Sequence, residues 1–174
     1  MAAISVLMPV RDCSLYLPEA IDSLLAQTFE DFEVLIYDDG SIDETRSIIA
    51  SYAKRDSRIL PIFGRQGRGI VHALNHLLEK ATGQYVARMD GDDRSLPSRL
   101  EAQIRLAREL SAKAIVFGAS ECIDESGNSL GFSASPDSDF MFHLAYRNPF
   151  IHPTLFMNRL MLKKYGYRNL PFAE

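Results

Sequence analysis

The chain has 174 residues, of which 47% are hydrophobic and 24% charged, as expected of one globular domain with its own core. This composition excludes a low-complexity, collagen-like or disordered chain. Because 19 Lys and Arg residues stand against 23 Asp and Glu residues, the net charge is -4, and we expect no nucleic acid as a partner.

Two cysteines, Cys13 and Cys122, lie far apart and form no CxxC pair. This spacing fits neither a disulfide framework nor a zinc site, and it favours a reducing, cytoplasmic location. Asp12 beside Cys13 should raise the pKa of its thiol and leave it unreactive. No apolar run approaches the roughly 18 to 20 residues that cross a bilayer, so the sequence predicts no membrane span.

Short apolar runs alternate with helical spacing along the first two thirds of the chain. The runs predict five strands, and apolar residues three or four positions apart predict a helix after each of the first four. Ser41 and Glu44 have the spacing of a capping box before the second helix, and Pro97 fits the first turn of the fourth. The five strands are expected at residues 4–10, 32–37, 59–63, 85–89 and 114–118. This alternation predicts an α/β fold: a mostly parallel sheet flanked by helices in three layers.

The pattern weakens after residue 121. Residues 123–128 are typical of a hairpin turn, residues 137–146 of a short helix, and residues 152–157 of a further strand. We therefore expect one domain over residues 1–174, in which an irregular half at 119–174 closes over a regular half at 1–118.

Two clusters of carboxylates follow predicted strands. Asp38-Asp39-Gly40-Ser41 comes after the second strand, and Asp90-Gly91-Asp92-Asp93 comes after the fourth. Ligands of such sheets bind at the carboxyl ends of the strands, so both clusters should face one cleft. A turn and a helix cap would equally explain Gly40 and Ser41, but they leave Asp39 unexplained.

The second cluster points to a metal ion. Three carboxylates within four residues repel one another unless a cation or a donor-rich ligand lies among them. Oxygen ligands of this kind suit Mg²⁺ or Mn²⁺, which complete their shells with water and substrate phosphates. The sequence therefore predicts a divalent cation together with a diphosphate.

Glycine spacing excludes the usual dinucleotide and P-loop sites. Residues 9–13 contain no glycine, so they cannot form the G-x-G-x-x-G turn that binds NAD. Gly64, Gly67 and Gly69 have the wrong spacing and follow the third strand, and no G-x-x-x-x-G-K-[ST] occurs.

Over nearly its whole length, the chain resembles the inverting, GT-A fold glycosyltransferases of family 2. The matching segments are the opening strand at 5–10, the first helix at 16–29, Asp-Asp-Gly-Ser-x-Asp-x-Thr at 38–45, the helix at 69–75, the metal segment at 83–93 with residues 97–101, and His-Pro-Thr at 152–154. The resemblance implies transfer of a sugar from a nucleotide sugar, most often a UDP-sugar, with inversion at the anomeric carbon.

The resemblance also implies how residues 1–118 bind the donor. Pro9, Val10 and Arg11 would contact the nucleoside largely through their backbone. Asp39 would accept a hydrogen bond from the base, and Asp38 would support Asp39.

The diphosphate and the metal would lie at the second acidic cluster. Asp90, with Gly91 beside it, would lie near the ribose or diphosphate, whereas Asp92 and Asp93 would hold Mg²⁺ or Mn²⁺. The sequence alone does not apportion these acids. Arg68 would either meet a phosphate or remain a solvated loop residue.

The acceptor would be a saccharide or a lipid-linked saccharide, with His152 on its side of the site or, equally, buried as a structural residue. The family's general base is an Asp that would come directly after Glu174, so we interpret residues 119–174 as a partial acceptor half of a longer protein. Further helices there would allow peripheral association with the inner face of the cell membrane.

Two other functions stay open. A nucleotidyltransferase also binds a nucleotide and a metal through paired acids, but it would need a Gly-rich, basic first loop, which residues 9–14 do not provide. A chain without its base could instead be a module that binds nucleotide and catalyses nothing.

Overall fold

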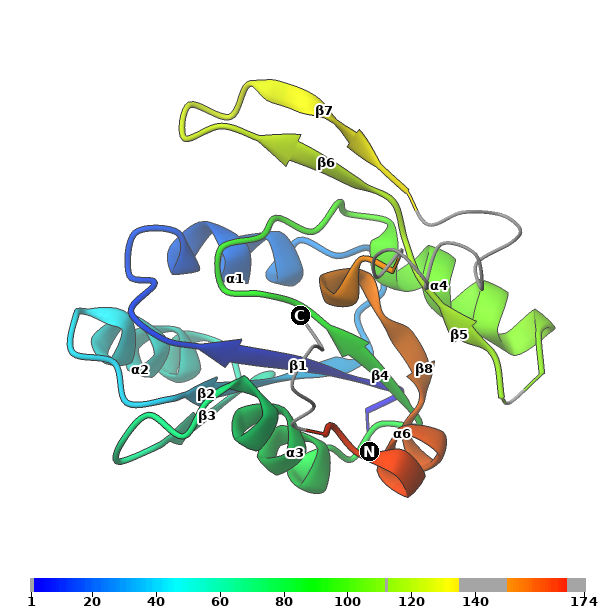
Figure 1. Cartoon of the computed structure of the whole chain (residues 1–174), viewed down its shortest axis with the longest axis horizontal. Helices are drawn as coiled ribbons and strands as arrows, with labels where there is room; N and C mark the ends of the chain where they lie inside the picture. The colour runs from blue at the N-terminus through cyan, green and yellow to red at the C-terminus, as the bar shows by residue number, and fades with distance from the viewer. Residues whose placement is uncertain (1, 112, 135–149, 169–174) are drawn as a thin grey trace.

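A six-stranded sheet with helices on both faces forms the body of the molecule in the computed structural model, which describes residues 2–111, 113–134 and 150–168 (Figure 1). Across the sheet the strands follow the order β3 (Ile59–Phe63), β2 (Phe32–Asp38), β1 (Ile4–Val10), β4 (Tyr85–Arg88), β8 (Phe156–Asn158) and β5 (Ile115–Val116). No helix in these ranges is both long and apolar enough to cross a membrane.

The sheet is mostly parallel, as predicted. β1 pairs in parallel with both β2 and β4, and β2 pairs in parallel with β3. Only β8 runs the other way, antiparallel to β4 on one side and to β5 on the other. The carboxyl ends of β1, β2 and β4 therefore lie side by side at one edge of the sheet.

Two hydrophobic cores cover the two faces of the sheet, giving the predicted three layers. Alternate residues of β1 point to opposite faces: Ile4, Val6 and Met8 join one core, whereas Leu7 joins the other. The first core packs against α1 (Leu17–Leu25), α2 (Thr45–Arg55) and α4 (Arg99–Glu109), and the second against α3 (Ile70–Lys80) and α6 (Arg159–Tyr165) (Figure 1).

The second half of the chain differs in part from the sequence prediction. The predicted turn at 123–128 is confirmed, because it joins the antiparallel strands β6 (Ser120–Ile123) and β7 (Ser129–Ser133), which project above the sheet in Figure 1. The predicted fifth strand shortens to the two residues of β5. The predicted helix at 137–146 lies outside the described residues.

The predicted strand at 152–157 was wrong at its start, where residues 152–154 form the 3₁₀ helix η1 (His152–Thr154) before β8. Pro153 has no N–H for a strand ladder, which disfavours a strand there. Two side chains of α4 bind the carbonyl oxygens of this turn: Arg99 Nη2 donates to Pro153 at 2.9 Å, and Gln103 Nε2 donates to Thr154 at 2.8 Å.

The predicted capping box was also wrong. Helix α2 begins at Thr45, and its N-cap residue Glu44 makes no side-chain cap hydrogen bond. The N–H of Thr45 donates to Asp43 Oδ1 at 3.0 Å. The hydroxyl of Ser41 instead accepts a hydrogen bond from the N–H of Asp12, across the edge of the sheet, at 2.9 Å. Pro97 lies just before the fourth helix, which begins at Arg99.

Gly91 allows the loop after β4 to pack against the end of β1. A Cβ at Gly91 would lie 2.7 Å from Val10 Cγ1 and 3.0 Å from Cys13 Sγ, and a branched valine has little freedom to move aside. We expect Gly91→Ala to lower the free energy of unfolding by about 1–3 kcal/mol, the usual cost of overpacking. Urea denaturation measures this change.

Gly118→Ala is the matched control, because its Cβ would lie at an ordinary 3.5 Å from the Thr154 side chain. Equal stability losses in the two variants would contradict the close packing of residues 90–93 against β1.

Candidate functional site

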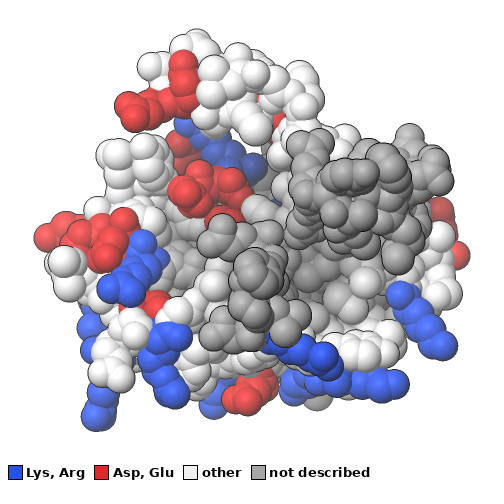
Figure 2. Space-filling model, viewed as in Figure 1, with Lys and Arg blue, Asp and Glu red and all other residues white. Residues whose placement is uncertain are grey.

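The loops after β1, β2 and β4 meet at the carboxyl edge of the sheet. The N–H of Asp39 donates to the carbonyl oxygen of Val10 at 2.9 Å, and Gly91 packs against Val10 and Cys13. The two acidic clusters thus flank the end of β1, one on each side. In Figure 2, acidic atoms are exposed in a hollow below the β6–β7 hairpin, with basic atoms beside them.

Side chains of the segment after β2 fix the loop after β1. Three consecutive backbone N–H groups donate to them: Asp12 to Ser41 Oγ at 2.9 Å, Cys13 to Thr45 Oγ1 at 3.0 Å, and Ser14 to Asp43 Oδ2 at 3.0 Å. Asp12 itself adopts a left-handed conformation with φ of 47°, which is strained for a residue other than glycine. These bonds hold the loop in one conformation and leave none of the three N–H groups free for a phosphate.

Two titratable groups where these loops meet, Asp43 and Cys13, have shifted pKa values. Hydrogen bonds from Thr45 and from Ser14 hold the pKa of Asp43 well below its usual range. Burial raises the pKa of the Cys13 thiol to about 11, and the charges of Asp43 and Asp92 add to the effect. The predicted direction for Cys13 is confirmed, although burial contributes more than the acidic neighbours.

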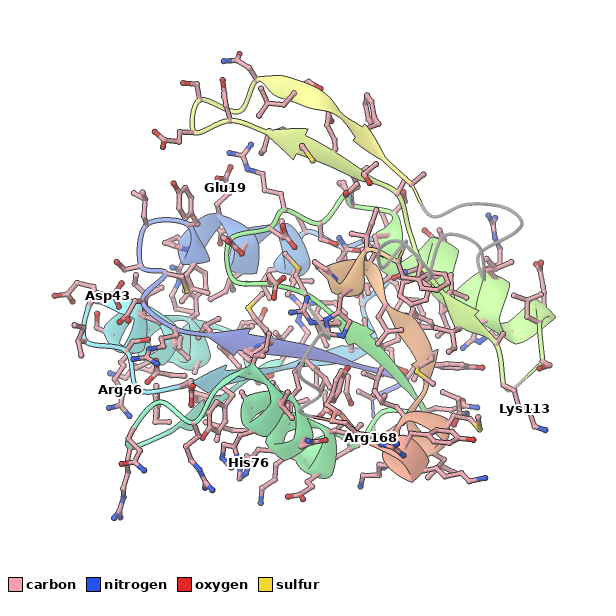
Figure 3. The ribbon with its side chains drawn as sticks, in the orientation of Figure 1. Glu19, Asp43, Arg46, His76, Lys113 and Arg168 are labelled. Atoms are coloured by element: carbon pink, nitrogen blue, oxygen red, sulfur yellow. The ribbon has the colours of Figure 1, made fainter. Side chains whose placement is uncertain are left out.

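Asp38 points into the protein rather than into the hollow. Its side chain is 0% exposed, Oδ1 accepts from the N–H of Ser41 at 3.0 Å, and Oδ2 lies 3.1 Å from Arg46 Nε. Arg46, which Figure 3 labels near Asp43, also donates through Nη2 to the carbonyl oxygen of Gly64. The buried carboxylate of Asp38 therefore holds neighbouring parts of the protein, Ser41 and Arg46, and is not accessible to a ligand.

Asp39 organises the loop before α3. Its residue is 5% exposed, and its two oxygens accept the N–H groups of Arg68 and Gly69 at 2.8–3.0 Å. The side chain of Arg68 remains exposed. Because each carboxylate oxygen has two acceptor positions, Asp39 can still accept a hydrogen bond from a ligand.

The three acids after β4 have different surroundings. Asp90 is held by Arg88, whose Nη1 and Nη2 donate to its two oxygens at 2.8 and 2.6 Å. Asp92 is exposed and makes no hydrogen bond or ion pair with the described residues. Burial raises the pKa of Asp93, and the negative charges of Asp90 and Asp92 raise it further.

This donor set fits a divalent cation that shares its shell with a diphosphate. Among the described residues, no three His, Cys, Asp or Glu side chains converge on one point. Mg²⁺ and Mn²⁺ need only one or two protein carboxylates when phosphates and water supply the rest. Asp92 is free to bind one, and a cation there would offset the repulsion that raises the pKa of Asp93.

His152 lies beside Arg88 in a partly buried environment. Burial lowers the pKa of His152 to about 4, and the positive charge of Arg88 contributes in the same direction. The Tyr167 ring meets the imidazole edge-on, with 5.7 Å between ring centroids. Asn75 holds the backbone of Tyr167 by two hydrogen bonds of 2.8 and 2.9 Å.

Sequence reasoning missed Arg88 and Tyr167. A signal existed for Arg88, because it is a charged residue in an apolar run and stands two positions before Asp90, on the same face of an extended chain. No local pattern marks Tyr167, whose position depends on contacts with residues far away in the sequence.

The chain is similar in sequence to known glycosyltransferases. The sequence model of "Glycosyl transferase family 2" matches residues 5–166. The chain is 34% identical over 169 residues to the putative glycosyltransferase EpsE of Bacillus subtilis, covering 96% of this chain and 60% of that protein. It is 34% identical over 167 residues to the O-antigen biosynthesis glycosyltransferase WbnJ of Escherichia coli, covering 94% and 65%. The chain therefore spans less than two thirds of either relative.

Solved structures share the fold at lower identity. Mannosyltransferase PcManGT from Pyrobaculum calidifontis, in complex with GDP-Man and Mn²⁺, matches with a TM-score of 0.70 and 20% identity, covering 96% of this chain and 47% of that one. Residues 1–349 of S. aureus TarS match with a TM-score of 0.72 and 21% identity, covering 94% and 49%. The α/β fold is thus that of the GT-A neighbours.

The neutral His152 predicts a specific loss of stability in acid. Its folded pKa of about 4 lies below the value of 6.5 in an unfolded chain, so the unfolded state takes up the proton first as the pH falls. Between pH 7 and pH 4.5 the wild type should lose about 1–2 kcal/mol more unfolding free energy than His152→Gln, after discounting for partial exposure. Denaturant titration at both pH values measures this difference, and equal losses would contradict the buried, neutral imidazole.

Proposed function

The chain belongs to glycosyl transferase family 2, and from this premise we propose that it transfers a sugar from a UDP-sugar to a saccharide or lipid-linked acceptor, with inversion and with help from a metal ion. Relatives named for O-antigen and for teichuronic acid biosynthesis support a saccharide acceptor. Structural neighbours solved with GDP-Man and Mn²⁺ and with UDP-GlcNAc support a nucleotide-sugar donor.

One observation carries this proposal: Asp39 and the acidic loop at 90–93 lie on opposite sides of Val10 at the end of β1. A nucleoside diphosphate laid across Val10 would have its base at Asp39 and its phosphates at the acidic loop. The two ends of the nucleotide match these two positions. A base offers an N–H to the acceptor Asp39, and a diphosphate needs the cation that the acidic loop would bind.

In this proposal each described group has a defined task. Pro9, Val10 and Arg11 contact the nucleoside, and Asp39 accepts from the base, held in place by Asp38. Arg68 is exposed next to Asp39, at the end of the site where we place the base, and it meets a phosphate only if its side chain extends across Val10.

The diphosphate end depends on the loop at 90–93. Asp90 accepts from a hydroxyl of the ribose or the sugar, and Gly91 lets the loop approach β1. Asp92 and Asp93 hold Mg²⁺ or Mn²⁺, which when bound supplies the Lewis acid for a departing diphosphate.

The acceptor hydroxyl attacks from the face opposite the diphosphate and gives its proton to a carboxylate, which yields inversion in one displacement. Residues 169–174 lie outside the described ranges. His152 would face the acceptor as a neutral ring that can donate and accept one hydrogen bond. We further propose a cytoplasmic location, with which the free thiols of Cys13 and Cys122 agree, and peripheral contact with the inner membrane face.

The geometry disfavours nucleotidyl transfer. That reaction would require a first loop whose N–H groups bind a triphosphate, whereas the N–H groups of residues 12–14 already donate to side chains after β2.

Nucleotide selectivity and metal dependence test the donor site, and neither readout needs a catalytic base. Calorimetric titration of UDP should show binding with Mn²⁺ and little binding with EDTA, because the diphosphate meets two carboxylates unless a cation intervenes. GDP and NAD, titrated in the same way, should bind more weakly than UDP. Equal UDP affinity with Mn²⁺ and with EDTA would contradict the metal-assisted site.

Asp92→Asn should weaken binding of UDP in Mn²⁺ by about tenfold or more, the effect of losing a carboxylate ligand, without lowering the melting temperature. Glu79→Gln on α3 is the matched control, since Glu79 is an exposed acid away from this edge of the sheet. Unchanged affinity in Asp92→Asn would remove Asp92 from the site.

A further inference from the structure

We propose that Arg88 is a positioning residue that divides the work among the three acids: it keeps Asp90 out of the metal shell and directs it toward a hydroxyl of the nucleotide sugar. This inference rests on the proposed function. It assigns a role to a residue that the acidic motif itself does not contain.

The hydrogen bonds between Arg88 and Asp90 occupy both carboxylate oxygens. Nη1 donates to Oδ2 at 2.8 Å and Nη2 donates to Oδ1 at 2.6 Å, so the two planar groups face each other edge to edge. Arg88 is 3% exposed, whereas the Asp90 side chain is 30% exposed. The pair therefore anchors Asp90 from inside the protein and leaves part of its carboxylate exposed.

The surroundings of Arg88 indicate that core packing alone does not account for it. It ends a strand whose other three residues, Tyr85, Val86 and Ala87, are buried and apolar or aromatic. Its Nε is buried and has no hydrogen-bond partner among the described residues, which costs free energy. The buried guanidinium of Arg99 lies close enough to interact unfavourably with it. An aliphatic residue would avoid both costs, so the benefit of arginine here lies in its contact with Asp90.

The charge of Arg88 also determines how many carboxylates of the loop at 90–93 are available to a cation. With Arg88 present, its guanidinium pairs with the carboxylate of Asp90 and occupies the inner lone pairs, which leaves Asp92 and Asp93 to bind the metal. Without Arg88, Asp90 would become a third free carboxylate beside them and would compete for the cation.

Two titrations separate this role from a merely structural one: Mn²⁺ binding without nucleotide, and UDP binding at saturating Mn²⁺. Arg88→Gln should bind Mn²⁺ about threefold to tenfold more tightly, because a carboxylate is released. It should bind UDP about tenfold more weakly, because Asp90 is no longer oriented. If Arg88→Gln merely damaged the structure, it would weaken the binding of both Mn²⁺ and UDP.

Two further variants serve as controls. The double variant Arg88→Gln/Asp90→Asn should return Mn²⁺ affinity to the wild-type value, since the released carboxylate is gone. Arg88→Lys keeps the charge without the bidentate geometry, so its Mn²⁺ affinity should match the wild type while UDP affinity is only partly kept. Unchanged affinities in Arg88→Gln, or a loss of both, would overturn the proposal.

Asp90→Asn keeps the proposal testable if Arg88→Gln does not fold. Asp90→Asn leaves the charge of Arg88 unbalanced, so it should weaken Mn²⁺ binding, but by less than Asp92→Asn, which removes a proposed ligand for the same change in charge. A loss as large as that of Asp92→Asn would show that Asp90 is a metal ligand and overturn the proposal. The Mn²⁺ titrations need no nucleotide, so they decide this inference even if wild-type UDP binding fails and the proposed function falls with it.

Discussion

The parallel pairing of β1 with both β2 and β4 is the constraint on which the candidate site depends. Because these three strands run in one direction, their carboxyl ends share an edge, and segments 81 residues apart come together there. The pairing places Asp39 on one side of Val10 and the loop at 90–93 on the other. A strand reversed at either position would carry its acids to the opposite edge.

Most of the polar residues around this edge bind the protein itself rather than face the hollow. Ser41, Asp43 and Thr45 bind the N–H groups of the first loop, and Asp38 is fully buried against Arg46. These hydrogen bonds and the ion pair between Asp38 and Arg46 hold the framework in one arrangement. It leaves few groups free for a ligand: the outer lone pairs of Asp39 and the acids of the loop at 90–93.

The sequence predicted the sheet and its two covering layers because strand and helix periodicities are local and strong. It also predicted that the two acidic clusters lie at one edge of the sheet, because each directly follows a strand of that sheet. Neighbouring carboxylates repel one another and are costly at a strand end that binds no cation or donor, which pointed to a ligand there. Ser41 was misassigned because a capping box and a bond to a distant loop have the same local sequence. The start of the 152–157 segment was misassigned because its conformation depends on Arg99 and Gln103, some 50 residues earlier. Arg88 was missed although it is a charged residue in an apolar run, two positions before Asp90.

A crystal structure of the chain with UDP and Mn²⁺ would show directly whether the nucleotide lies across the end of β1. We expect the base at Asp39, the diphosphate beside Gly91, and Mn²⁺ bound by Asp92 or Asp93 while Asp90 stays paired with Arg88. A nucleotide bound elsewhere, or a metal ion bound by Asp90 with Arg88 displaced, would contradict this arrangement.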